Sequence, residues 1–255
     1  MAHWPDLEAE LAAWAADGRM AVFWWRDDDA RTATPALDRL LALAEDADVP
    51  LTLAVVPADA DRTLVRRLDG LDLVDVAPHG LRHANHAPAD QKKAEFGAHR
   101  ATDLMRAEIG EGWQRLQAQF GGRARPVFVP PWNRIAPDLV DGLATIGFTG
   151  LSRFGARARP APAPGLTEGN CHIDVINWRH GGGFVGTAVA LDQVITHLSN
   201  RRLGAADPAE PTGLMTHHLA MDEDCWVFTA QLIDFIKNSE TACWYSMQHN
   251  FRLPA

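Results

Sequence analysis

Short apolar segments alternate with longer amphipathic segments along this chain. The short segments are rich in β-branched and aromatic residues, whereas the longer ones repeat apolar residues at helical spacing. This alternation is typical of βα units around a parallel sheet, and it favours a barrel. We expect strands at residues 20–26, 50–56, 71–77, 126–130, 147–151, 172–178, 213–217 and 242–247.

The segments between these strands predict helices that each bury one face. The first two apolar stripes consist of Leu37, Leu40, Leu41 and Leu43 after Pro35, and of Leu104, Ile109, Trp113, Leu116 and Phe120. We expect further helices at about 4–17, 137–146, 188–203 and 223–237, the last with Asp222 as its N-cap. The Pro-rich and Gly-rich stretches 157–170 and 202–213 predict surface connections that are too short to separate domains.

Composition narrows the class of protein. Lys and Arg number 24 and Asp and Glu number 33, so the net charge is −9 and no nucleic-acid partner is expected. No apolar run approaches the roughly 18 residues of a membrane span, and the first residues show neither a basic start nor a cleavage site. We therefore expect a cytoplasmic protein without a membrane partner. Cys171, Cys225 and Cys243 predict reduced core thiols.

Three successive aspartates, Asp27, Asp28 and Asp29, end the first predicted strand. Their mutual repulsion requires a cation or hydrogen-bond donors, and a metal ion is the simplest cation. The alternative is an acidic turn or helix N-cap ahead of Thr34. Neighbours on a regular strand point to opposite faces, so Asp27 and Asp28 share a site only where the strand ends or bulges. Asp29 therefore remains a further candidate.

Histidines follow the third predicted strand at a spacing suited to one ion. His79 and His83 are four residues apart, and His86 lies one further turn along. With one aspartate they form a two-histidine, one-carboxylate set that leaves positions open for water and substrate. We expect one divalent ion, zinc first, with cobalt, nickel, manganese or iron as alternatives.

Two further segments carry chemistry of lower specificity. Trp132 offers a flat apolar wall, and for Trp178 the alternative is an ordinary place in the core. His217 and His218 end a strand and point apart, so we expect one in the cleft, able to give a proton to a leaving group, and one in a structural role. The alternative is that both bind loop carbonyl groups.

Taken in order, the segments RDDD, HGLRH, FVPPWN, DVINW and LMTHH resemble the five motifs of the polysaccharide deacetylase, or NodB-homology, family of carbohydrate esterases. The resemblance covers residues 20–247 and implies an α/β fold, a distorted (β/α)7 TIM-like barrel. It implies a single deacetylase-like catalytic domain over residues 1–255.

The resemblance also implies roles for individual residues. If the family motif TFDDG corresponds to residues 25–29, Asp27 is the catalytic base and Asp28 is the metal ligand. The resemblance then implies His79 and His83 as the histidine ligands and His217 as the general acid.

The implied substrate contacts are the side chains of Trp132, Asn133, Arg134 and Trp178. Two positions depart from the family pattern. Val129 stands where the family has an arginine that orients the catalytic aspartate, and Arg26 or Arg134 would have to replace that arginine. Gly80 stands where the family has Ser or Thr.

These observations predict a metal-dependent hydrolase that removes an N-acetyl or related N-acyl group from an amino sugar or other saccharide. Val129 supports one alternative, a sugar-binding barrel without turnover. The lack of a recognisable secretion signal supports another, a metal-dependent amidase acting on a small amide or imide. The oligomeric state is not predicted.

Overall fold

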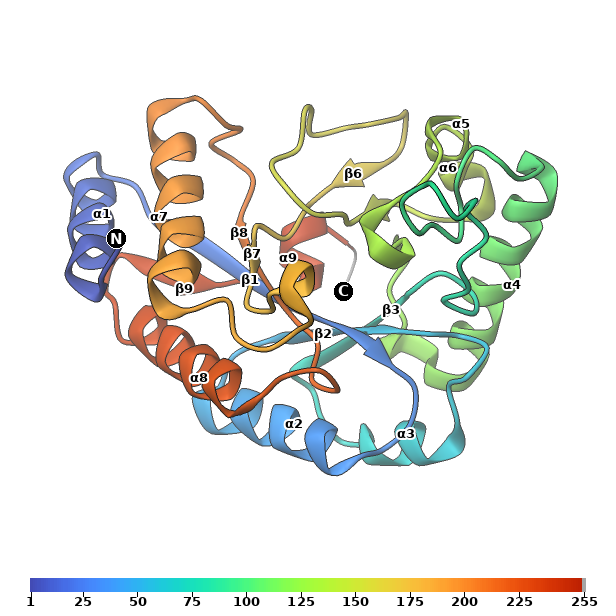
Figure 1. Ribbon diagram of the computed structural model, residues 1–255, viewed down its shortest axis with the longest axis horizontal. Coiled ribbons are helices and arrows are strands. Elements are labelled where there is room, and N and C mark those ends of the chain that lie inside the picture. Colours follow the sequence, from blue (N-terminus) through green and yellow to red (C-terminus); the bar gives the residue numbers. More distant parts are fainter. Residues whose placement is uncertain (254–255) are drawn as a thin grey trace.

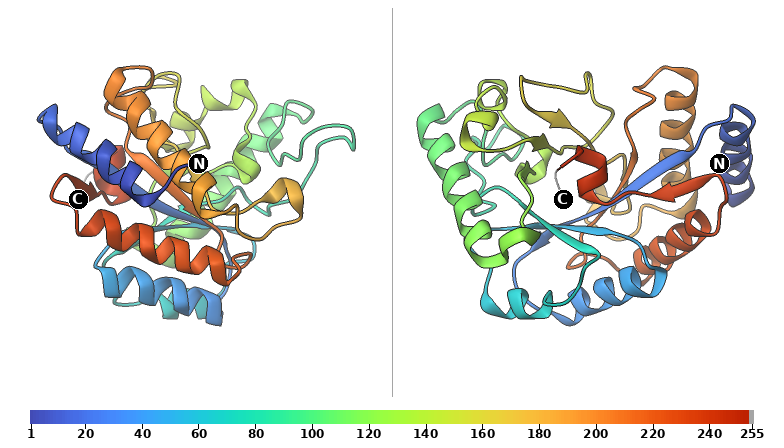
Figure 2. Two further views of the ribbon diagram at one scale, coloured as in Figure 1. Left: turned by 60° about the vertical axis from the view of Figure 1, so that its left-hand side comes forward. Right: turned by 180° about the vertical axis from the view of Figure 1, so that it is seen from behind.

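The strands lie side by side in parallel sheets, with helices around the outside (Figures 1 and 2). The computed structural model describes residues 1–253. The strands are β1 (Ala21–Ala30), β2 (Leu51–Val55), β3 (Val74–Pro78), β4 (Val127–Phe128), β5 (Gly150–Leu151), β6 (Thr167–Glu168), β7 (Ile173–Asp174), β8 (Thr212–Thr216) and β9 (Ala242–Trp244).

The helices alternate with these strands. They are α1 (Trp4–Ala16), α2 (Pro35–Ala47), α3 (Arg62–Arg67), α4 (Thr102–Phe120), α5 (Pro137–Val140), α6 (Leu143–Ile146), α7 (Thr187–Leu203), α8 (Glu223–Lys237) and α9 (Met247–Phe251). Short 3-10 turns lie at Gly121–Arg123, Pro131–Asn133 and Trp178–His180.

The sheets together form an irregular barrel. One sheet has the order β3-β2-β1-β8-β7, with β9 also pairing with β1, and the other has the order β4-β5-β6. The bridge between His79 and Val129 connects β3 to the β4 side, and the bridge between Phe154 and Cys171 connects the β5 side to β7. The predicted α/β barrel is thereby confirmed, with short strands in its second half.

The barrel has an inner and an outer apolar face. Trp24, Ala54, Ala77, Val129, Cys171 and Met215, which come from different strands, form one buried cluster with Met247 and Phe251 of α9. Phe23 and Trp25 belong to a second cluster that includes the buried faces of the outer helices. Since neighbours on a strand alternate between faces, Trp24 and Arg26 lie on the inner side of β1.

Local sequence explains the helix starts that were predicted. Thr34 accepts a hydrogen bond from the Leu37 N–H ahead of α2, which begins with Pro35. Asp222 accepts a hydrogen bond from the Cys225 N–H ahead of α8, as expected for its N-cap role.

Some predictions about elements were wrong. The stretch 157–170 is not only a surface connection, because it contains β6, where Glu168 is buried. Leu104 does not belong to the buried stripe of α4, since 52% of its surface is exposed. The predicted helix at 137–146 is two short helices, α5 and α6.

The cysteines are free, and Cys171 and Cys225 are buried, whereas Cys243 is partly exposed. Within residues 1–253, no helix combines the length and the apolar character needed to cross a bilayer.

Candidate active site

A bulge in β1 presents the aspartates. Asp27 pairs with Leu53 and Ala30 with Val55, so β1 has one more residue than β2 between these two pairs. Asp29 has a φ of 74°, a left-handed conformation that is uncommon outside glycine. Of the two possibilities at the aspartates, a strand end or a bulge, the structure has a bulge, which interrupts the regular alternation of their side chains.

Asp29 is the aspartate that faces the two histidines. Its Oδ1 lies 3.4 Å from Nε2 of His79 and 3.2 Å from Nε2 of His83. The carboxylate is partly buried, and this oxygen has no hydrogen-bond partner among the described residues. Burial alone would raise the pKa of Asp29, but His79 and His83 outweigh it and hold the pKa well below its usual range.

The His79 ring is oriented by a main-chain carbonyl group. Its Nδ1 lies 3.1 Å from the carbonyl oxygen of Val129, which can only accept, so Nδ1 donates its proton there. Burial acts to lower the pKa of His79, but Asp28 and Asp29 outweigh it and raise the pKa. In the neutral ring Nε2 carries the lone pair and faces Asp29, which is the tautomer that a metal ligand requires. Val129 therefore contributes through its backbone.

His83 completes the group from a strained position. Its φ is 55°, and its ring packs 4.2 Å from that of Trp132. Burial first, and then the neighbouring His79, lower the pKa of His83 to about 4. The His83 ring is therefore neutral at physiological pH and able to act as a ligand.

The donor atoms of Asp29, His79 and His83 fit a divalent ion. All three lie within 4.8 Å of one another. A tetrahedral zinc ion with bonds of about 2.0–2.1 Å separates its ligand atoms by roughly 3.4 Å. The two oxygen-to-nitrogen distances in the group match that separation. Asp28, which we expected to stand with the histidine pair, is not part of this group.

Asp28 instead pairs with Arg26 on the inner face of β1. Arg26 donates from Nε to Oδ1 of Asp28 at 2.7 Å and from Nη2 to Oδ2 at 2.9 Å, and both side chains are buried. Burial acts to raise the pKa of Asp28, but Arg26 first, then His79 and His217, hold the pKa below its ordinary value. Asp28 is therefore an ionised carboxylate in the barrel interior.

Arg26 has further partners that fix its orientation. It donates to Ser152 Oγ at 2.6 Å and to Asn133 Oδ1 at 2.9 Å. Arg134, the other arginine considered, donates to the carbonyl oxygen of Lys93 and is not part of this cluster. Of the two, Arg26 is therefore the one that contacts an aspartate of the triplet.

The structure separates the two consecutive histidines. His217 Nε2 lies 3.9 Å from Oδ2 of Asp28, and the His217 ring contacts Trp178 edge-on at 4.9 Å. Trp178, whose surface is 51% exposed, donates from Nε1 to Asp174 Oδ2 at 2.9 Å. His217 therefore lies between an inner carboxylate and an exposed aromatic side chain.

His218 is buried on the other face of the sheet with Asp27. The ring Nδ1 of His218 lies 2.5 Å from Oδ1 of Asp27, and the main-chain N–H of His218 donates to Oδ2 at 2.9 Å. Thr216 donates to the same oxygen at 2.7 Å. Asp27 is fully buried, and its hydrogen bonds are to these two residues, away from the histidine pair.

Two groups are placed in ways that the sequence did not indicate. His86 is exposed and donates its N–H to the Ala94 carbonyl group, outside the donor group. Glu95 is buried and accepts hydrogen bonds from the loop between His79 and His83. No local pattern marks Glu95, because it is 12 residues beyond His83 in an irregular segment.

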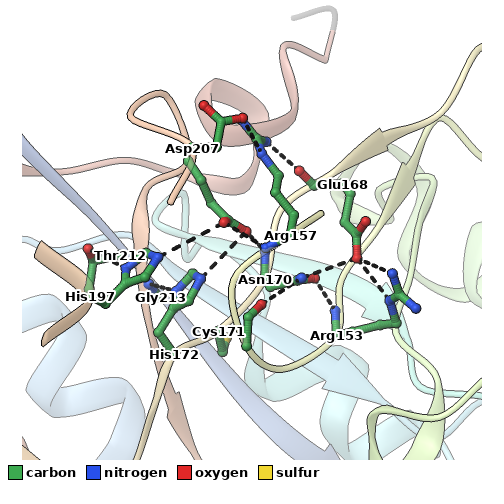
Figure 3. Close-up of polar contacts among 12 residues, drawn as sticks. Arg153, Arg157, Glu168, Asn170, Cys171, His172, His197, Asp207, Thr212 and Gly213 are labelled. Carbon is green, nitrogen blue, oxygen red and sulfur yellow. Dashed lines mark hydrogen bonds and ion pairs between the residues drawn. The ribbon is translucent and has the colours of Figure 1, made fainter. Parts of the chain in front are cut away.

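A second group of donor atoms lies outside this cleft, between β7 and β8 (Figure 3). It consists of the buried residues His172, His197 and Glu210. The Glu210 carboxylate also accepts hydrogen bonds from the N–H groups of Arg157 at 2.9 Å and Asn170 at 3.2 Å. Burial raises the pKa of Glu210 to about 7.

The geometry of this second group does not suit an ion. The His172 and His197 rings are stacked, 3.4 Å apart and inclined by 13°. An ion must lie near the plane of each ring at about 2.0–2.1 Å from the nitrogen, and two stacked planes do not meet within that distance. His172 Nδ1 also accepts the Gly213 N–H, which leaves the proton on Nε2. The group is a buried polar network.

Comparisons with known proteins agree with the barrel. No protein-family model and no curated protein matches the chain. Among solved structures, a family 4 acetyl xylan esterase from Clostridium thermocellum with a cobalt ion is 16% identical, covers 91% of each chain and has a TM-score of 0.54.

Two other solved structures are similar over most of their length. A family 4 carbohydrate esterase from Streptomyces lividans in complex with acetate is 16% identical, covers 89% of this chain and 91% of its own, and has a TM-score of 0.53. A peptidoglycan deacetylase from Bacillus subtilis is 12% identical and has a TM-score of 0.57. The match covers 92% of this chain and 91% of the deacetylase chain. The chain therefore has the fold of the family 4 carbohydrate esterases and polysaccharide deacetylases.

Proposed function

We propose that this protein is a metal-dependent hydrolase that removes an acetyl or related N-acyl group from an amino sugar or other saccharide. One observation carries the proposal. The ion-binding donors of Asp29, His79 and His83 lie beside an ionised inner carboxylate and an accessible imidazole at the same end of the barrel. Reacting groups of βα barrels occupy the ends of their strands.

The proposed ligands are Asp29, His79 and His83, one residue later in the aspartate triplet than the resemblance implied. When bound, a divalent ion supplies Lewis-acid chemistry by polarising the acyl carbonyl group and making water more acidic. Zinc suits this donor set, as do cobalt, nickel, manganese and iron.

Asp28 takes the role of the general base. Its ionised carboxylate is held in one orientation by the two hydrogen bonds from Arg26. A base that is already ionised can accept the proton of an attacking water molecule, provided that it lies within hydrogen-bond reach. His79 is close enough to help lower the pKa of Asp28, which supports a position beside the ion-binding group.

His217 takes the role of the general acid. An amine is a poor leaving group, so breaking the C–N bond requires a proton. His217 Nε2 lies 3.9 Å from Oδ2 of Asp28, the proposed base. Trp178 on one side and Trp132 on the other offer apolar surfaces for the acyl group and the sugar ring.

Metal content and turnover of four variants test these roles. We expect Asp29→Ala and His79→Ala to lose both the metal and the activity, because each removes a ligand. Asp28→Asn should keep the metal and lose about 10²–10⁴-fold in turnover, since only the base is changed. Elemental analysis of the purified proteins and release of acetate from N-acetylated chitin oligomers provide the two measurements.

Asp27→Asn is the matched control that tests which aspartate of the triplet is the base. It removes the same charge from a residue whose hydrogen bonds are to Thr216 and His218. It should keep the metal and lose far less turnover than Asp28→Asn. If Asp27→Asn lost all turnover while Asp28→Asn kept it, the assignment of the base would be wrong.

A panel of substrates tests the acyl group and its carrier. Acetylated amino sugars, acetylated xylan and small amides or cyclic imides should be compared with the same metal-loaded protein. Preference for the N-acetyl sugars supports the proposal. A preference for the small amides would replace it with an amidase, and metal binding without any turnover would indicate a sugar-binding barrel.

A further inference from the structure

The geometry points to Glu95 as a positioning residue for the ion site. We infer that its carboxylate shapes the loop that carries His79 and His83, and thereby sets how tightly and in which geometry the ion is held. This inference rests on the proposed function, because it takes Asp29, His79 and His83 as the ligands.

The Glu95 side chain is buried and binds three consecutive N–H groups of this loop. Oε2 accepts from Leu81 and His83, each at 3.2 Å, and Oε1 accepts from Arg82 at 2.8 Å. A main-chain N–H that is buried without a partner is unfavourable, so this carboxylate stabilises a loop that would otherwise leave its donors unpaired. Two of these donors, Leu81 and Arg82, lie between the two histidine ligands in sequence, and the third is the N–H of His83 itself.

Gly80 is complementary to this carboxylate. Its φ is 65°, and a Cβ atom at this position would overlap Glu95 Oε2 and lie 2.6 Å from Pro131 Cγ. The space that a side chain at position 80 would fill is thus occupied by Glu95. The departure from the family's Ser or Thr at this position therefore has a physical reason in this chain.

Glu95 is itself held in place from several directions. Arg100 donates to its carbonyl oxygen at 3.0 Å and forms two hydrogen bonds of 2.8 Å with Glu108 of α4. The next residue, Phe96, is fully buried and pairs with Ile135. The carboxylate therefore has a fixed position from which to orient the loop.

The conformation of His83 shows why the loop needs such support. Its φ of 55° is a left-handed conformation that is unfavourable for a residue other than glycine. The hydrogen bond from its N–H to Glu95 lies at the strained residue itself. Without that bond, the His83 ring loses part of what keeps Nε2 directed at Asp29.

Cobalt titration of metal-free protein tests the inference. We expect Glu95→Gln to bind Co²⁺ about 10–100-fold more weakly than the wild type, the range typical for residues that orient ligands. Glutamine keeps the volume of the side chain, but its NH₂ group cannot accept from the loop. The visible absorption of the bound cobalt should also change, because it reports the geometry of the ligands.

Glu111→Gln is the matched control, since it removes the same charge from a partly exposed residue of α4 that pairs with Arg115. It should keep the wild-type affinity and spectrum. If Glu95→Gln does not fold, Glu95→Asp keeps the charge but is too short to reach all three N–H groups, and it should show the same weakening.

The outcomes separate this inference from the proposed function. A wild-type protein that does not bind Co²⁺ would contradict the proposed function. Wild-type binding, together with an unchanged affinity and spectrum in a folded Glu95 variant, would overturn the role of Glu95 alone.

Discussion

Arg26 shows that an arginine on β1 can orient an aspartate in place of the arginine that the family has at the position of Val129. The family resemblance placed an orienting arginine at position 129, where this chain has valine. The structure supplies a guanidinium from β1 itself, two residues before Asp28, with both side chains buried. Because residues i and i+2 of a strand share a face, this substitution needs no change in the backbone.

Arg26→Met should therefore be costly. Removing one partner of a buried ion pair typically lowers the free energy of unfolding by about 3–5 kcal/mol, because the other charge remains buried and unpaired. Urea unfolding of the variant measures this loss. Arg134→Met is the control, since Arg134 donates only to the Lys93 carbonyl, and its loss should be much smaller. Equal losses would contradict the role of Arg26.

The residue types of the site were visible in the sequence, but their individual places were not. Asp27, Asp28 and Asp29 look alike in sequence, and which one faces the histidines depends on a one-residue bulge. The separation of His217 from His218 followed from strand alternation alone. Alternation predicts neighbours correctly in a regular strand and fails where the register shifts.

Among the elements, the loop after β3 depends on a residue outside it, Glu95. Its shape needs Gly80 in a left-handed conformation and the Glu95 carboxylate in the space beside it. A side chain introduced at position 80 would therefore be unfavourable for two reasons, the backbone conformation and the steric overlap.

Two glycine variants separate these sources. Gly70 has a φ of 76° with nothing within 4 Å of its Cβ position, so Gly70→Ala should cost only the backbone term of about 1–2 kcal/mol. Gly80→Ala adds overlap with Glu95 and Pro131, and we expect about 2–5 kcal/mol in total. Thermal or urea unfolding provides the comparison. Equal losses of unfolding free energy in the two variants would show that the neighbours of position 80 move aside without an energetic penalty.

The longer elements were predictable from periodicity, whereas the irregular parts were not. α2 and α4 follow from apolar stripes that are local in sequence, and Thr34 and Asp222 cap α2 and α8. β6 has only two residues and lies in a stretch rich in proline, so no pattern marks it. Glu95 was missed for the same reason, since its function depends on contacts 12–14 residues away.

At the scale of the whole molecule, the His172–His197–Glu210 network connects the second half of the barrel to β8. Burial, then Arg201 and Arg157, lower the pKa of His172 to about 3, and burial, then His172, lowers that of His197 to about 2. Both rings are therefore neutral in the folded protein well below pH 6.5.

This network makes stability depend on pH. Below about pH 6.5 the unfolded chain binds a proton at each ring that the folded protein does not. The free energy of unfolding therefore decreases by about 1.4 kcal/mol for each ring with every unit by which the pH is lowered. Glu210 has the opposite effect between pH 4.5 and about pH 7. Its pKa is raised in the folded protein, so in this range it lowers the free energy of unfolding as the pH rises.

His197→Gln tests this account. The variant removes one ring, so the slope of the unfolding free energy against pH, measured by urea unfolding between about pH 4.5 and 5.5, should fall by about 1.4 kcal/mol per unit. His172→Gln should show the same change. An unchanged slope in both variants would mean that the two rings take up protons in the folded protein.

β1 is synthesised before its neighbour β8, and the contacting residues Arg26 and Met215 are 189 residues apart. Until β8 is made, β1 has an unpaired edge, and such edges make partly folded chains prone to aggregation. Asp29, His79 and His83 all emerge well before His217. Chains that end before β8 therefore hold the three proposed ion-binding donors without the imidazole that we propose as the general acid.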